Sequence, residues 1–138
     1  IKKFIHQFAS PKTYLFQVDR AYSYIFYISL FIYLGSLFWG LFLTYEDFVQ
    51  GNSYRIIYLH VPASFISQSL YLAMAFASAI FLIWKVKLSA YLVKSIAPIG
   101  AITTFIALIS GSIWGIPTWG TWWAWDARII STLILFIM

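Results

Sequence analysis

Three long stretches of the chain contain no Lys, Arg, Asp or Glu, and they constrain the fold more than any other feature. They cover residues 21–45, 56–84 and 95–125 and are 25, 29 and 31 residues long. A helix needs about 20 predominantly apolar residues to cross the hydrocarbon core of a bilayer. The sequence therefore predicts an all-α, polytopic membrane helix bundle. Its spans are expected at about 22–43, 61–84, 95–114 (ended by Gly115 and Pro117) and 127–138, the last incomplete.

Composition excludes the main alternatives. Of the 138 residues 62% are hydrophobic and 9% charged, whereas a soluble domain carries roughly a quarter charged residues. The absence of Cys excludes a disulfide scaffold, a thiol redox step and a Cys-x-x-Cys-His haem attachment site. No P-loop motif is present, so energy from ATP would have to come from a partner. The chain begins at Ile1 and ends within an apolar run, so we expect an internal fragment of a longer protein.

The distribution of basic residues predicts the orientation in the membrane. Seven of the nine Lys and Arg residues precede the first span or lie between the second and third, namely Lys2, Lys3, Lys12, Arg20, Lys85, Lys87 and Lys94. By the positive-inside rule, this side faces the cytoplasm of a bacterium or the mitochondrial matrix, and the loop at 114–126 faces outward from the inner membrane. The net charge of +5 thus reflects a position in the lipid bilayer, and no nucleic-acid partner is expected.

Tryptophan is concentrated in this outer loop. Five of the seven Trp residues fall within residues 114–128: Trp114, Trp119, Trp122, Trp123 and Trp125. One interpretation is an interfacial aromatic belt, although a belt needs only one or two Trp per helix end. The other is a platform for a large planar apolar ligand, with Gly115 and Gly120 allowing close approach to the backbone.

His60 is the second candidate site residue. It precedes Pro62, which we expect in the first turn of the second span, and should lie roughly 7 Å outside the hydrocarbon edge, level with the Trp loop. A neutral imidazole there could ligate a metal, including haem iron. A hydrogen-bonded interfacial histidine is the alternative interpretation.

Charged residues flank both features. Arg55 and Arg128 could pair with carboxylates of a ligand through bidentate hydrogen bonds, although Arg55 could equally be a membrane-edge anchor. Asp126 is expected to cap the fourth helix and to pair with Arg128. Small and hydroxyl-bearing residues of the third span are expected to serve helix packing: Gly100, Ala101, Thr103, Thr104, Ser110, Gly111 and Ser112.

Residues 119–126, which read WGTWWAWD, resemble the tryptophan-rich signature of the haem-handling membrane proteins of cytochrome c maturation. Residues 51–63, with His60, resemble the segment before the second span in one branch, the haem-handling protein C family (CcmC). Residues 97–101, 104–108 and 111–115 resemble the third span of that branch. The chain departs from the family pattern at Ile130 and Thr132.

The resemblance implies a six-span protein that binds haem b at the outer membrane surface and helps to deliver it to a membrane-anchored haem chaperone. It implies transporter-like membrane subunits with a separate ATPase subunit as partners, and no enzymatic activity. His60 would be the first of two axial histidines, the second lying beyond a fifth span and outside this sequence. The five tryptophans and Asp126 would belong to the cofactor site, and Arg55 and Arg128 would meet the propionates.

Two other functions stay open. A subunit of a membrane transport complex could use the Trp loop as a protein-docking surface and never bind haem. A respiratory or quinone-reacting oxidoreductase subunit would hold haem within the bilayer. That class needs histidines inside its spans, and the first and third spans contain none.

Overall fold

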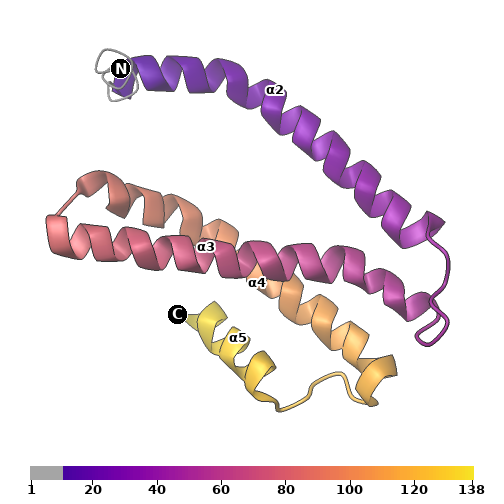
Figure 1. The fold of residues 1–138 in the computed structure, drawn as a ribbon. Helices are drawn as coiled ribbons and strands as arrows, with labels where there is room; N and C mark the ends of the chain where they lie inside the picture. The colour runs from indigo at the N-terminus through magenta and orange to yellow at the C-terminus, as the bar shows by residue number, and fades with distance from the viewer. Residues whose placement is uncertain (1–10) are drawn as a thin grey trace. The chain divides into compact units, whose positions relative to one another are not determined.

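The computed structural model describes residues 11–138, with the side chains of Asp19 and residues 21–138. Its elements are α2 (Pro11–Phe38), the π-helical turn η1 (Trp39–Leu43), the 3-10 turn η2 (Asn52–Ile56), α3 (Ile57–Trp84), α4 (Lys87–Trp119) and α5 (Ala127–Ile137) (Figure 1). The described residues form no strand, so the predicted all-α class is confirmed. Lys2 and Lys3 lie outside the described residues, as do the side chains of Lys12 and Arg20.

Within residues 11–138, three helical segments are long and apolar enough to cross a membrane, and the chain is a multi-pass membrane protein. These segments are Ala21–Leu43, Asn52–Trp84 and Lys87–Trp119. The first belongs to a compact unit that ends at Leu43, and the other two belong to a second unit, residues 44–138. The apolar helix α5 has 11 residues and is about 16 Å long, which is short of the roughly 30 Å of a hydrocarbon core.

Two helices of the second unit, α3 and α4, are longer than the predicted spans, so the predicted starts of both and the predicted end of the third span were wrong. Gly115 and Pro117 do not end α4, which continues to Trp119. A proline removes one helical N–H, but here the helix ends only at Gly120, which has a left-handed φ of 72° and donates its N–H to the carbonyl of Ile116 at 3.0 Å. Trp114 and Trp119 are therefore helical, and the connection to α5 is shorter than predicted.

The start of α3 and its connection to α4 also differ from the prediction. Pro62 lies inside α3 rather than in its first turn, because η2 leads directly into a helix that begins at Ile57. Only Lys85 and Val86 separate α3 from α4, so Lys87 and Lys94 are helical. The two helices run antiparallel and side by side (Figure 1). This hairpin places Lys85 at one end and His60 with Trp114 at the other.

Small residues form the contact between α3 and α4. Thr104 is fully buried, and Ala63, Ser67, Ala77 and Ala107 are buried as well. The hydroxyls of Ser67 and Thr104 lie 2.5 Å apart, and Thr104 donates to the carbonyl of Gly100 at 2.7 Å. Thr104 has one hydroxyl hydrogen, so Ser67 donates to Thr104. Most large apolar side chains remain exposed, as expected where lipid replaces water and helices associate through small residues.

Thr104→Val should weaken this contact. The change keeps the side-chain shape but removes the acceptor of Ser67, and interhelical hydrogen bonds in membranes contribute about 0.6 kcal/mol on average. We expect a loss of that order in the free energy of unfolding, measured by denaturant titration in detergent micelles. Thr103→Val is the matched control, because Thr103 donates to carbonyls of its own helix. Equal losses in the two variants would contradict the interhelical bond.

Candidate functional site

One turn of α4 supports the ring of His60 on three sides. His60 Nδ1 lies 3.1 Å from Ser110 Oγ. Gly111 lies against the ring at Cε1, since a Cβ placed there would be 2.9 Å from this atom. The ring of Trp114 meets the imidazole edge to face, with centroids 5.8 Å apart. Residues 110, 111 and 114 share one helix face, so α4 determines where the imidazole of α3 lies.

A hollow of about 280 Å³ borders His60 and is lined by three helices. Its lining includes His60, Ser64 and Gln68 of α3, Gly111 and Trp119 of α4, and Arg128 and Thr132 of α5. The lining combines an imidazole, an aromatic ring, a guanidinium group and several hydroxyls. Of the predicted site residues, the structure thus brings together His60, Trp119 and Arg128.

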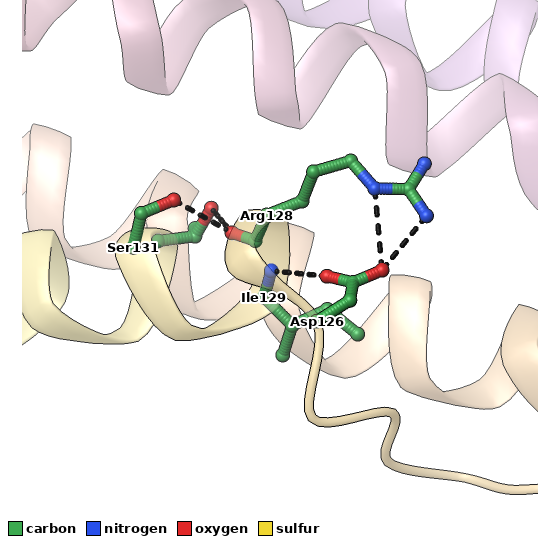
Figure 2. Close-up of polar contacts among 5 residues, drawn as sticks. Asp126, Arg128, Ile129 and Ser131 are labelled. Atoms are coloured by element: carbon green, nitrogen blue, oxygen red, sulfur yellow. Dashed lines mark hydrogen bonds and ion pairs between the residues drawn. The ribbon is translucent and has the colours of Figure 1, made fainter.

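Arg128 and Asp126 form an ion pair at the start of α5. One carboxylate oxygen of Asp126 accepts from Arg128 Nη2 at 2.8 Å and from Nε at 3.2 Å, while the other oxygen accepts from the backbone N–H of Ile129 at 2.9 Å. Figure 2 shows these contacts. The predicted cap and ion pair are both confirmed. The guanidinium also lies over the ring of Trp119, 5.5 Å from its centroid. The N–H of Ile129, and secondarily Arg128, lowers the pKa of the Asp126 carboxyl.

Three tryptophans line a separate hollow of about 510 Å³ together with Thr121: Trp122, Trp123 and Trp125. Trp122 and Trp123 are inclined by 50°, and Trp123 and Trp125 by 75°. The three rings therefore do not form one flat platform. Trp122 and Trp125 are 66% and 79% exposed. Trp123 Nε1 is buried and has no hydrogen-bond acceptor among the described residues.

The two glycines of the Trp segment have structural roles, and at Gly115 the prediction of room for a ligand was wrong. Gly115 accommodates the connection after α4, because a Cβ there would be 3.0 Å from the carbonyl oxygen of Thr121 and 3.2 Å from the ring of Trp119. Gly120 provides the left-handed residue that ends α4. The space that Gly115 leaves is thus occupied by the protein itself.

Two further predicted site residues, Trp114 and Arg55, form hydrogen bonds with the loop before η2. Trp114 donates its Nε1–H to Gln50 Oε1 at 2.9 Å. Arg55 donates from Nη2 to the carbonyl of Thr44 at 2.7 Å and is not among the residues lining either hollow. The guanidinium of Arg55 thus closes this loop, and its role toward a propionate stays a prediction.

Sequence reasoning missed several contributors to the site. Ser64 and Gln68 follow His60 at intervals of four residues, so their shared helix face was readable from spacing alone. Gln50, Thr132 and the contact between Ser110 and His60 had no comparable signal, because each depends on how separate segments meet. Thr132, a position where the chain departs from the family pattern, lines the His60 hollow and donates to the carbonyl of Arg128 at 2.7 Å.

Comparison with known proteins identifies the family. The family model described as CcmC, Heme exporter protein C, matches residues 4–138. The chain belongs to this family. Heme exporter protein C of Escherichia coli (strain K12) is 45% identical over 137 residues, which are 99% of this chain and 56% of that protein. The Haemophilus influenzae protein of the same name is 41% identical, over 99% of this chain and 55% of its own length.

A mitochondrial relative extends the family beyond bacteria. The putative cytochrome c biosynthesis ccmC-like mitochondrial protein of Marchantia polymorpha is 44% identical over 108 residues, 78% of this chain and 47% of that protein. This CcmC-family chain spans about half the length of the curated relatives it matches. The predicted family resemblance is confirmed, and it extends over nearly the whole chain.

Gly111→Ala should displace His60 in this CcmC-family chain. The added Cβ would overlap His60 Cε1, so we expect the ring to turn away from Ser110 and lose a hydrogen bond worth about 1 kcal/mol. Gly100→Ala is the matched control, because its Cβ would make an ordinary 3.5 Å contact with Met74 Cε. Changed His60 ring resonances and lower stability are expected for Gly111→Ala alone. Identical behaviour of the two variants would contradict the close packing.

Asp126→Asn should lower stability in a pH-dependent way. The Asn side-chain oxygen can still accept from the N–H of Ile129, but the negative charge of the carboxylate is lost. Because the folded-state pKa of Asp126 lies below its ordinary value, the charge contributes fully above about pH 4 and is lost as the pH falls through the folded pKa. The difference in thermal midpoint between wild type and variant should therefore be largest at neutral pH and should disappear at acidic pH. A difference independent of pH would exclude the charge as its cause.

Proposed function

We propose that this chain binds haem at the outer surface of a bacterial or mitochondrial inner membrane and helps to deliver it for cytochrome c maturation. One observation carries the proposal. His60 borders a hollow between three helices, and the same hollow is lined by Trp119 and Arg128. The names of the relatives, heme exporter and cytochrome c biosynthesis protein, favour this interpretation of the site.

The residues present fit haem by their chemistry. A neutral imidazole is an axial ligand of haem iron, a guanidinium suits a propionate, and an indole face suits a porphyrin plane. The hollow, at about 280 Å³, is slightly smaller than the usual small-molecule pocket of roughly 300–1,000 Å³. It would enclose only part of such a group and leave the rest accessible, as a protein that passes its cargo on requires.

Individual residues would have distinct roles in the proposed site. His60 would supply the first axial nitrogen to haem b. Arg128 would meet a propionate, held in place by Asp126 and by the ring of Trp119. Trp114 would keep the imidazole oriented from the side. Bound haem would supply only its iron and its anionic edge, since delivery needs no bond to be broken in this chain, and we propose no enzymatic activity.

The exposed tryptophans would serve the transfer to partners. Trp122 and Trp125 are mostly exposed and lie at a hollow separate from that of His60. We assign this second hollow, with Trp123, to contact with a membrane-anchored haem chaperone. Transporter-like subunits with a separate ATPase would be further partners. The basic end of the α3–α4 hairpin, with Lys85 and Lys87, would face the cytoplasm or matrix.

His60→Ala in the intact protein tests the haem assignment. Loss of an axial nitrogen should remove bound haem or shift its absorbance bands, measured on protein purified from haem-replete membranes. His6→Ala is the matched control, since His6 is the other histidine of this sequence. An unchanged haem spectrum in His60→Ala would refute the ligand assignment. A wild-type protein that purifies colourless with every Trp and His intact would instead favour the docking subunit without haem.

A further inference from the structure

We propose that Ser110 sets the tautomer of His60, so that the proton lies on Nδ1 and Nε2 is the ligating atom. Ser110 is thereby a positioning residue that acts on the imidazole from the neighbouring helix. The part of this inference that concerns haem rests on the function proposed above, whereas the tautomer itself belongs to the haem-free protein.

Ser110 has a single hydroxyl hydrogen to donate. Ser110 Oγ lies 2.6 Å from the carbonyl oxygen of Ile106, which is a short and favourable donor distance, and 3.3 Å from that of Ala107. Both neighbours are acceptors, so the hydrogen of Ser110 is committed to its own helix. Its oxygen can then only accept at the 3.1 Å contact with His60 Nδ1. A neutral imidazole that donates from Nδ1 carries its lone pair on Nε2.

The surroundings of the two ring nitrogens agree with this assignment. Ser110 is 4% exposed and does not line the hollow, so Nδ1 faces the helix contact. Ser64 does line the hollow, and its Oγ is 3.5 Å from His60 Nε2. That contact is at the limit of hydrogen-bond length, so it leaves the Nε2 lone pair largely free. The nitrogen that can ligate is thus the one beside the hollow.

This arrangement has a consequence for metal binding. A histidine ligand whose other nitrogen donates a hydrogen bond is fixed in its tautomer and ring orientation and is a stronger base toward the metal. Loss of such an outer partner typically reduces metal affinity about 10–100-fold. Ser110 and His60 come from different helices, so the tautomer depends on the packing of α3 against α4.

The haem-free protein provides the decisive experiment. Intact protein labelled with ¹⁵N-histidine is examined by NMR at alkaline pH, where imidazole is neutral, and the His60 signals are those lost in His60→Gln. We expect the wild type to carry its proton on Nδ1. Ser110→Ala should shift the population toward Nε2–H, and Ser110→Thr, which keeps a hydroxyl, should restore Nδ1–H. Ser95→Ala is the control, because its hydroxyl donates to the carbonyl of Tyr91 on the same helix.

The outcomes separate the inference from the proposed function. A wild-type His60 protonated on Nε2 would overturn the role of Ser110 whether or not haem binds, and so would an unchanged tautomer in Ser110→Ala. In haem titrations, Ser110→Ala should bind about 10–100-fold more weakly with shifted absorbance bands, and Ser110→Thr should recover both. If His60→Ala leaves the haem spectrum unchanged while the tautomer is as expected, the haem assignment fails and the Ser110–His60 contact stands.

Discussion

The close approach of α3 and α4 is the constraint on which the candidate site depends. Lipid tails are as apolar as the side chains, so the hydrophobic effect does not drive the two helices together. They must associate through contacts between small groups. Ser67 and Thr104 provide such a contact, in which each hydroxyl donates a hydrogen bond. Further along the same face, Gly111 lets the ring of His60 lie against the α4 backbone. One packing pattern thus both joins the helices and orients the imidazole.

The membrane-spanning character of the chain could be predicted because it depends on length and charge alone. A backbone in hydrocarbon must satisfy its own hydrogen bonds, so charge-free runs of sufficient length become helices. Helix ends were predicted less well. Gly115 and Pro117 are residue types that commonly end a helix. Helix α4 nevertheless continues through both and ends at Gly120, which adopts a left-handed φ. Which glycine takes that conformation is decided by backbone geometry, which residue type alone does not specify.

The candidate site was predictable by residue type and only partly by arrangement. His60, Trp119 and Arg128 line one hollow, as expected for residues at the same end of the helices. Two contacts were not predictable: the hydrogen bond from Arg55 to the carbonyl of Thr44 and the contact of Ser110 with His60. Helices in lipid are apolar on most faces, so periodicity does not reveal which face meets which neighbour. Contacts between helices then require coordinates.

The pairing of Arg128 clarifies how one cation could serve both structure and ligand. Its side chain is 77% exposed, and an exposed ion pair contributes little to stability because water screens it. Asp126 is held independently by the N–H of Ile129, so it would keep its cap position if the guanidinium turned toward an anionic ligand. The ring of Trp119 limits that movement from the other side. A cation held by one weak ion pair and one aromatic face can therefore exchange partners at little cost, as the proposed binding and release of haem would require.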